Sequence, residues 1–200
     1  MTAPAIAALL LAAGRSSRMG ANKLVLELAG KSLVAHAADQ ALAAGFTRVV
    51  VVTGHHPEAV HAALSGRPLS WVHNPLFEQG LSSSLKAGLA ALPDDIDAVL
   101  VCLGDMPKVD ALHMRAIAEA FDPGAGHTIC VPVFGGKRGN PALFGRRHFA
   151  EMMTLEGDRG ARSLMDKHAG CVRLVELPDD AVLEDVDTPD AFARLVAHDI

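Results

Sequence analysis

Residues 6–23 read IAALLLAAGRSSRMGANK, so that an apolar run over Ile6–Ala13 passes directly into a glycine and a group of basic residues. Eight consecutive apolar residues without polar alternation are typical of a strand that is covered on both faces of a parallel sheet. No basic residue precedes the run, and it is far shorter than the roughly 20 residues of a membrane-spanning helix. We therefore interpret it as a buried strand and not as a signal or membrane segment.

Further strands and helices alternate along the first two thirds of the chain. Apolar segments that end at turn residues predict strands over Arg48–Thr53, Leu69–His73 and Ala98–Leu103. Helical patterns lie between them, over Ser32–Ala44, Pro57–Leu64, Ser82–Leu92 and Val109–Phe121. This alternation predicts a three-layer, Rossmann-like α/β fold with a mostly parallel sheet and right-handed crossovers.

The last third is less regular. We expect a hairpin-like pair of strands over Thr128–Phe134 and Pro141–Phe144, joined by a glycine-rich turn. With short helices over Arg146–Met153 and Ala161–His168, the hairpin is expected to form a small lobe over the sheet, at about residues 128–170. The remaining segments are strand-like over Cys171–Leu177 and Val182–Val186, before a closing helix that Asp187 or Thr188 caps and Pro189 begins.

Composition narrows the class of protein. A chain of 200 residues, half of them apolar and 20% charged, predicts a single globular domain over residues 1–200. The net charge of −5 and the 4% of aromatic residues argue against a nucleic-acid or acidic-membrane binder. Three scattered cysteines fit no disulfide framework or metal spacing and favour a reducing cytoplasm.

The loop after the first strand has the chemistry of a phosphate cradle. Residues 14–23 hold two glycines, two serines and three cations but no acidic residue, within a negatively charged protein. Glycines let backbone N–H groups approach an anion, and arginine and lysine bind phosphate directly. The spacing fits neither a P-loop, because Val25 stands where its first glycine would be, nor a dinucleotide-binding fingerprint. A solvated surface loop is the alternative.

Carboxylates follow two later segments. Asp105 comes directly after the strand Ala98–Leu103, at the same sheet edge as the basic loop, where it would suit Mg²⁺ together with phosphate oxygens. The alternative is that Asp105 caps the next helix. Asp185 and Asp187 share one face of an extended segment, and Asp187 is open to the same two interpretations. His55 and His56 are expected at a loop rim, and Cys102 is expected to be an inert core residue.

These motifs together resemble a known family. The stretch Leu11-Ala12-Ala13-Gly14-x-Ser16-x-Arg18-Met19-Gly20-x-x-Lys23 resembles the signature of nucleotidyltransferases with a GT-A-like fold. Further segments, in the same order over nearly the whole chain, are similar to the molybdenum cofactor cytidylyltransferase branch: Val52-Thr53-Gly54-His55, Asn74-Pro75-x-Phe77-x-x-Gly80-x-x-x-Ser84-Leu85-Lys86-x-Gly88, Gly104-Asp105-Met106-Pro107, Gly139-Asn140-Pro141 and Asp185-Val186-Asp187-Thr188-Pro189.

The resemblance implies a role for each matched residue. Arg15 and Lys23, with Gly14, would hold the triphosphate, and Asp105 and Asp187 would bind Mg²⁺; Arg15, Lys23 and Asp105 are thus the expected catalytic residues. The rest of the expected nucleotide site is Leu11, Ala12, Ala13, Thr53, Gly54, Asn74, Gly80 and Ser84. An anionic acceptor would also need cations, and residues 135–162 hold six basic residues against three acidic ones. Beside Gly139 and Asn140, the candidate cations there are Arg159, Lys137, Arg138 and Arg162, with ordinary surface charges as the alternative.

The implied reaction is transfer of CMP from CTP to the phosphate of molybdopterin, with release of pyrophosphate. In this family Ala12-Ala13-Gly14 is similar to the CTP users, whereas Ala-Gly-Gly marks the GTP users. A molybdenum oxidoreductase is the expected recipient of the product. Two alternatives stay open: transfer of a cytidylyl or guanylyl group to another phosphorylated acceptor, such as a sugar 1-phosphate, and a carrier of the cofactor without catalysis.

Overall fold

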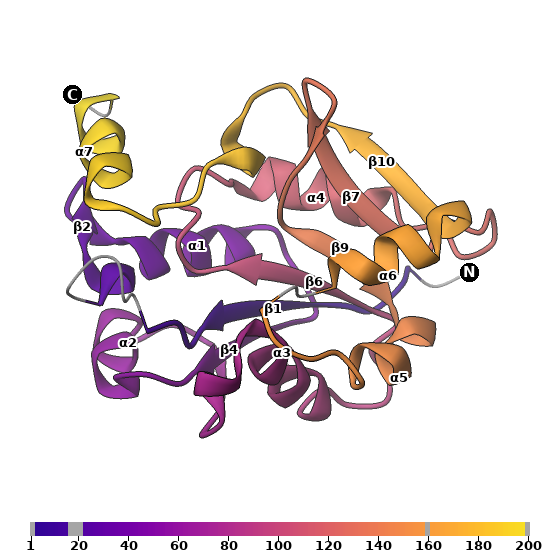
Figure 1. Cartoon of the computed structure of the whole chain (residues 1–200), viewed down its shortest axis with the longest axis horizontal. Helices are drawn as coiled ribbons and strands as arrows, with labels where there is room; N and C mark the ends of the chain where they lie inside the picture. The colour runs from indigo at the N-terminus through magenta and orange to yellow at the C-terminus, as the bar shows by residue number, and fades with distance from the viewer. Residues whose placement is uncertain (1–2, 16–21, 159–160, 199–200) are drawn as a thin grey trace.

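The first strand lies in the interior of the main sheet. The structure, a computed structural model, describes residues 3–15, 22–158 and 161–198. Strand β1 (Ile6–Ala12) is buried at all seven positions and lies between two parallel neighbours, β4 (Arg48–Thr53) and β6 (Ala98–Leu103) (Figure 1). The uninterrupted apolar run therefore forms the doubly covered strand that it predicts.

Seven strands follow one another across the main sheet in the order β10-β7-β9-β6-β1-β4-β5, and an eighth, β8, pairs with β7. All pairs are parallel except those of β9 and β8. The remaining bounds are β5 (Ser70–His73), β7 (Ile129–Phe134), β8 (Lys137–Arg138), β9 (Ala142–Gly145) and β10 (Val172–Glu176); a separate small sheet pairs β2 (Glu27–Leu28) with β3 (Lys31–Ser32).

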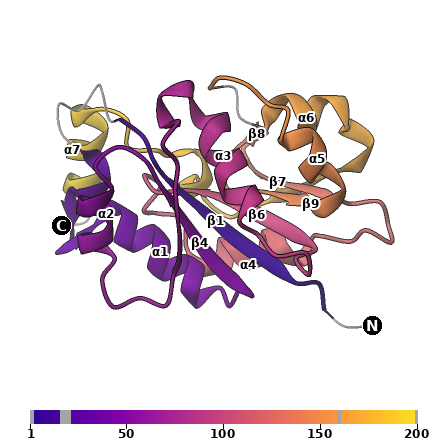
Figure 2. The ribbon, with the colours of Figure 1, turned by 90° about the horizontal axis from the view of Figure 1, so that it is seen from below.

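Helices cover both faces of the main sheet, which confirms the three-layer α/β architecture (Figure 2). Leu10 of β1 packs in one core cluster with α1 (Leu33–Ala43), α2 (Pro57–Ala63) and α4 (Ala111–Glu119). Its neighbour Leu9 packs in the other cluster, with α3 (Leu81–Ala90), α5 (Phe149–Met152) and α6 (Arg162–Lys167). Successive side chains of one strand thus pack against helices on opposite faces of the sheet.

Shorter elements complete the chain. Helix α7 (Pro189–His198) packs beside the small sheet through Leu195, which shares a cluster with Leu28 and Leu33. The 3₁₀ helices are η1 (Lys23–Val25), η2 (Phe77–Gln79), η3 (Arg146–His148), η4 (Ala169–Cys171) and η5 (Ala181–Leu183). Among the described residues, no helix combines the length and the apolar character needed to cross a membrane.

The last third differs from the expectation in two ways. Strands β7 and β9 do pair with each other, but they extend the main sheet and do not stand over it. Of the expected lobe, helices α5 and α6 lie over the sheet face. The second difference is at residues 182–186, where the strand prediction is wrong because η5 occupies the start of that segment. Val182 is buried as a strand residue would be, but it packs from a helical turn.

Candidate active site

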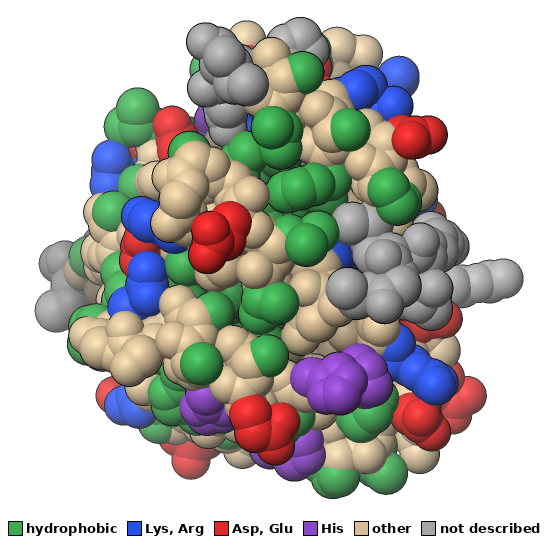
Figure 3. Space-filling view, turned by 90° about the vertical axis from the view of Figure 1, so that its left-hand side faces the viewer, with side chains coloured by type: hydrophobic (Ala, Val, Ile, Leu, Met, Phe, Trp, Pro, Cys, Tyr) green, Lys and Arg blue, Asp and Glu red, His purple; other side chains and the backbone are tan. Residues whose placement is uncertain are grey.

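The carboxyl ends of β1 and β6 carry the basic and acidic groups to one place. The two strands are adjacent and parallel, so Gly14 and Arg15 after β1 and Asp105 after β6 leave the sheet at the same edge. All three line a cavity of about 440 Å³. Figure 3 shows this face of the molecule, with hydrophobic side chains at its centre and charged side chains around them.

Lys23 enters the same cavity from η1. The Asn22 side chain caps this short helix by accepting a hydrogen bond from the Leu24 backbone N–H at 3.2 Å. Leu24 is buried, and a Cβ on Gly104 would lie 3.2 Å from its side chain. The glycine after β6 therefore leaves room for Leu24, which anchors Lys23 beside Asp105.

The Lys23 ammonium group joins two carboxylates that are far apart in the sequence. Its Nζ atom donates to Asp105 Oδ2 at 2.5 Å and also to Asp187 Oδ1. Asp187 arrives there because the backbone N–H of Val186 donates to the Asp105 carbonyl oxygen at 3.0 Å. The side chains of Lys23 and Asp105 are only 12% and 15% exposed, so this contact is shielded from water.

Other residues make the capping contacts at the two helices that follow these carboxylates. The N-cap of α4 is Asp110, whose side chain accepts from the His113 backbone N–H, and not Asp105. At α7, Thr188 Oγ1 accepts from the Ala191 backbone N–H at 3.2 Å. The capping interpretation of Asp105 is therefore wrong. The sequence left two candidates for the cap of the closing helix, Asp187 and Thr188, and Thr188 makes a capping contact.

A third carboxylate completes the group. Oxygens of Asp105, Asp185 and Asp187 lie within 4.8 Å of one another. Hard divalent cations such as Mg²⁺ and Mn²⁺ prefer carboxylate oxygens, so the donor set fits such an ion. Sequence reasoning did not assign Asp185 to the metal, although its position two residues before Asp187 in an extended segment puts both side chains on one face.

The charges in this group act on one another. Burial disfavours the Lys23 ammonium, but the ion pairs and hydrogen bonds with Asp105 and Asp187 outweigh it and leave the pKa of Lys23 above its usual value. Partial burial of the Asp185 carboxyl group, together with the negative charges of Asp187 and Asp105, raises the pKa of Asp185. The three carboxylates thus carry more negative charge than one lysine neutralises.

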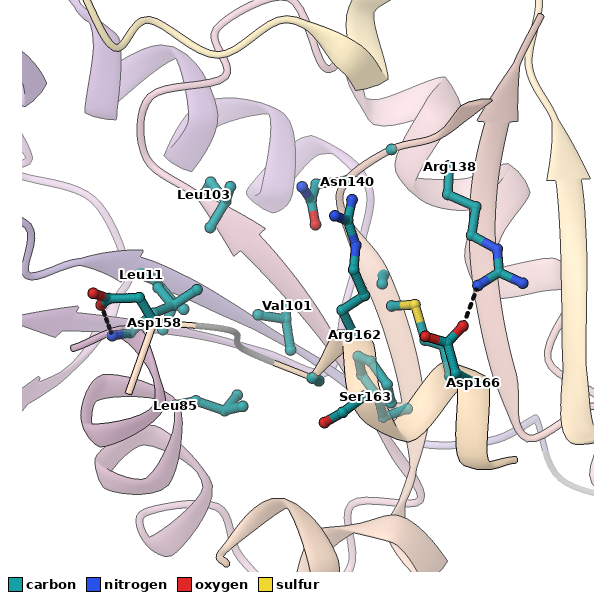
Figure 4. A pocket seen from close by; sticks show the side chains of 16 residues that line it. Leu11, Leu85, Val101, Leu103, Arg138, Asn140, Asp158, Arg162, Ser163 and Asp166 are labelled. Carbon is teal, nitrogen blue, oxygen red and sulfur yellow. Dashed lines mark hydrogen bonds and ion pairs between the residues drawn. The ribbon is translucent and has the colours of Figure 1, made fainter. Parts of the chain in front are cut away.

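A second, larger cavity of about 580 Å³ lies beside the first (Figure 4). Its floor is apolar and comes from β1, β6, β9 and α3. Polar side chains reach it from other elements: Arg162 and Ser163 come from α6, and Arg138 of β8 pairs with Asp166 at 3.0 Å. Gly139 and Asn140, which were predicted to contact the acceptor, also line this cavity. Lys137 does not appear among its lining residues.

The two cavities share part of their walls, namely Leu11, Leu81, Leu103 and Asp158. Asp158 lies at the start of α3, where its Oδ1 atom accepts from the Leu81 backbone N–H at 3.1 Å. A Cβ on Gly80 would lie 2.5 Å from that same oxygen. Gly80 therefore allows the chain around Asp158 to close against the start of α3, and neither Asp158 nor Leu81 was singled out from the sequence.

The predicted nucleotide residues divide into two sets. Leu11, Ala13, Gly14, Arg15, Lys23, Gly80 and Ser84 line the smaller cavity, as does Asp105. Ala12, Thr53, Gly54 and Asn74 do not line it.

The second set supports the cavity from behind. Thr53 and Asn74 are almost fully buried, and the Asn74 amide donates to the hydroxyl oxygens of Ser83 and Ser84 at 2.9 and 3.0 Å. A Cβ on Gly54 would lie 2.6 Å from Phe77 Cβ and 2.8 Å from Ala13 Cβ. These residues hold the walls in place by packing and hydrogen bonding, and Phe77, which lines the cavity, was not assigned from the sequence.

Several predictions lie outside the described residues. Arg159, expected to bind the acceptor, is one, and the central part of the signature, with Ser16, Arg18, Met19 and Gly20, is another. Two other expectations rest on described residues. His55 lies beside His56 and Phe77 with ring-centroid distances of 4.0 and 5.7 Å. Burial raises the pKa of Cys102 to about 12, as expected for an inert thiol.

Comparison with known proteins places this geometry in context. The sequence model described as the MobA-like NTP transferase domain matches residues 8–172. The chain is 32% identical to the nicotine blue oxidoreductase of Paenarthrobacter nicotinovorans, over 96% of this chain and 97% of that protein. It is 28% identical to the molybdenum cofactor cytidylyltransferase of Escherichia coli (strain K12), over 94% of each.

Solved structures agree with these matches. Rv0371c from Mycobacterium tuberculosis H37Rv superposes with a TM-score of 0.86 at 30% identity, covering 98% of this chain and 100% of that one. A structure of Rv0371c in complex with manganese gives a TM-score of 0.81 at 28% identity, covering 96% and 98%.

Proposed function

The chain belongs to the MobA-like NTP transferase family, and on that premise we propose that it transfers CMP from CTP to the phosphate of molybdopterin and releases pyrophosphate. The observation that carries the proposal is the pair of cavities with a common wall. Charged side chains of both signs line the smaller cavity, among them Arg15, Lys23 and Asp105, whereas the larger cavity has an apolar floor with charged groups beside it. A transferase needs such a pair, because its donor and its acceptor must meet.

The smaller cavity suits the nucleotide. Arg15 and Lys23 would bind the triphosphate oxygens, and the backbone at Gly14 is open enough for an anion to approach, because a Cβ there would meet nothing within 4 Å. Ala13 is nearly buried at the inner wall, where its methyl group would limit the size of the base. With the resemblance of Ala12-Ala13-Gly14 to CTP users, this favours CTP over GTP.

The larger cavity suits a flat heterocyclic acceptor with an anionic group. Leu85, Val101 and Phe144 offer apolar surface but no hydrogen bonds, and Arg138 is already paired with Asp166. A sugar 1-phosphate needs several hydrogen-bonding side chains around its hydroxyl groups, which this floor lacks. Arg162, beside the apolar floor, is placed to attract the acceptor's negative charge.

The chemistry needs positioning and charge neutralisation more than a base. An ionised phosphate oxygen of molybdopterin would attack the α-phosphorus of CTP, and the bond from that phosphorus to the oxygen bridging the β-phosphate would break. Asp105, Asp185 and Asp187 would hold a divalent ion, proposed to be Mg²⁺, that neutralises phosphate charge when bound. Lys23 and Arg15 would stabilise the negative charge on the leaving pyrophosphate.

Pyrophosphate release with CTP, GTP and ATP, each with and without molybdenum cofactor, tests the proposal. We expect a signal that requires both the cofactor and CTP. A signal with sugar 1-phosphates instead would indicate a different acceptor, and tight cofactor binding without pyrophosphate would indicate a carrier. In either case the proposed reaction would be wrong. If the expected signal is observed, binding of the cytidylylated product to a molybdenum oxidoreductase would identify the recipient.

The 32% identity to nicotine blue oxidoreductase supports a second candidate, which is oxidoreduction of a small organic compound in the larger, apolar cavity. This reaction would need a hydride donor such as NADH or NADPH. Oxidation of either nucleotide, followed at its absorbance with nicotine blue as the acceptor, tests it. Activity that survives Asp105→Ala would favour this candidate, because hydride transfer makes no use of the carboxylate group.

A further inference from the structure

The Lys23 ammonium group contacts the same carboxylates that are the candidate ligands of the divalent ion. Its Nζ atom lies 2.5 Å from Asp105 Oδ2 and also bonds Asp187 Oδ1. Both carboxylates belong, with Asp185, to the group whose oxygens lie within 4.8 Å of one another. One cation of the protein itself thus sits where carboxylate charge is most concentrated.

A divalent ion at this group of carboxylates would compete with Lys23 for these oxygens. A magnesium ion binds oxygen at roughly 2.0–2.1 Å, and a lysine ammonium is a compact point charge that must also touch its acceptors. Side by side on one pair of oxygens, a divalent ion and an ammonium would be separated by only a few ångströms. Their mutual repulsion would be stronger there than in bulk water, because Lys23 and Asp105 are shielded from solvent even though Asp187 is 44% exposed.

We propose that Lys23 and the ion are alternative occupants of the Asp105–Asp187 pair, and that Lys23 turns to the triphosphate when the ion binds. This inference rests on the proposed use of a divalent ion. Lys23 lines the nucleotide cavity already, so its flexible side chain needs only to leave the carboxylates and not to cross the molecule. Without the ion, Lys23 offsets the repulsion between the two carboxylates and is withheld from the nucleotide.

Cooperative binding follows from this exchange. The ion carries two positive charges to the carboxylates and releases the single charge of Lys23 to the phosphates. By linkage, the ion strengthens triphosphate binding and the triphosphate strengthens ion binding by the same factor. Lys23 then couples binding of the ion to binding of the triphosphate, in addition to any contact that it makes with the nucleotide.

Binding of Mn²⁺ alone is the first test, measured by the electron paramagnetic resonance of the free ion with the full chain and no nucleotide. We expect Lys23→Gln to bind Mn²⁺ about tenfold more tightly than the unaltered protein, because the competing ammonium is gone. Lys23→Met serves if the glutamine variant does not fold, as checked by thermal unfolding.

Two matched variants control for loss of positive charge in general. Arg15 lines the same cavity but pairs with Glu78 at 3.4 Å, and Lys31 pairs with Asp39 at 2.7 Å. We expect Arg15→Gln and Lys31→Gln to change Mn²⁺ affinity by less than about twofold. Equal or weaker Mn²⁺ binding in the Lys23 variants would overturn the proposal, as would an equal gain in the Arg15 variant.

Inorganic triphosphate gives the second test, by calorimetry with Mg²⁺ and with EDTA. In EDTA, we expect the unaltered protein and Lys23→Gln to bind it with nearly equal affinity, because Lys23 stays on the carboxylates. With Mg²⁺, the unaltered protein should bind it at least about tenfold more tightly than the variant. An equal defect of the variant under both conditions would overturn the exchange.

Neither test uses cytidine or molybdopterin. If the exchange fails, transfer of CMP can still be observed; if CMP transfer is not observed, the two binding tests still decide whether Lys23 and the ion exclude each other.

Discussion

The two cavities share a wall but are built from different kinds of residue. The smaller one takes its character from charged side chains in loops that follow β1 and β6, namely Arg15, Lys23 and Asp105. The larger one takes its character from the apolar face of the sheet and from α6. Charged residues at strand ends can be recognised in a sequence as a candidate site. Apolar residues that line a cavity have the same sequence pattern as residues of the core, so an apolar site is hard to recognise.

The largest effect is expected from Asp105→Ala, which removes a carboxylate of the smaller cavity that Lys23 contacts and that would hold the divalent ion. Transfer should fall by roughly 10³-fold or more, since phosphate charge would no longer be neutralised in the transition state. Steady-state pyrophosphate release over a Mg²⁺ titration measures it. Asp94→Ala, at a fully exposed carboxylate, is the matched control. Near-normal turnover would remove the metal assignment.

Lys23→Ala comes next and also concerns the smaller cavity. We expect kcat/KM for the nucleotide to fall by roughly 10²–10³-fold, which corresponds to about 2–4 kcal/mol of transition-state stabilisation. Initial rates at varied CTP and saturating acceptor measure this, with Lys86→Ala as a control, since that lysine does not line either cavity. Unchanged kcat/KM would show that the loop does not hold the triphosphate.

Arg162→Ala is expected to affect the larger cavity, where Arg162 is a lining residue. Because Arg162 is exposed at the rim, its loss should raise KM for the acceptor by only about tenfold and leave KM for CTP unchanged. Separate titrations of the two substrates distinguish these outcomes. Arg147→Ala, an exposed arginine outside both cavities, is the control. A rise in the KM for CTP instead would mean that the roles of the cavities are reversed.

Ala13→Gly is expected to have the smallest effect. Removing one methyl group from the inner wall of the smaller cavity should shift the ratio of kcat/KM values toward GTP by no more than about tenfold. A panel of nucleotides assayed under one condition measures the ratio. Ala161→Gly, in the wall of the larger cavity, is the comparison and should leave the ratio unchanged. The steric account fails if both variants keep the original preference.

The sequence predicted β1, β4, β5 and β6 closely, because each is a largely apolar segment that ends at a turn residue. It did not predict the small sheet of β2 and β3, whose two-residue strands are not apolar runs. It failed at Val182–Val186, where a buried apolar residue packs from a 3₁₀ turn and not from a strand. It also placed Asn74 and Thr53 with the nucleotide, whereas the structure buries both behind the cavity wall. A motif shows that a residue matters but not whether it touches the ligand or supports a neighbour.

The order of apolar runs and turn residues by itself determined that this chain is an α/β protein with a basic loop and a carboxylate at one sheet edge. Continuous apolar runs indicate buried strands, and the helices that alternate with them indicate that these strands are parallel. Only the tertiary structure decided that Asp185 joins Asp105 and Asp187, and that Lys23 binds two of these three carboxylates. Those contacts join residues up to 164 positions apart, and they depend on a hydrogen bond between Val186 and Asp105 that no local pattern specifies.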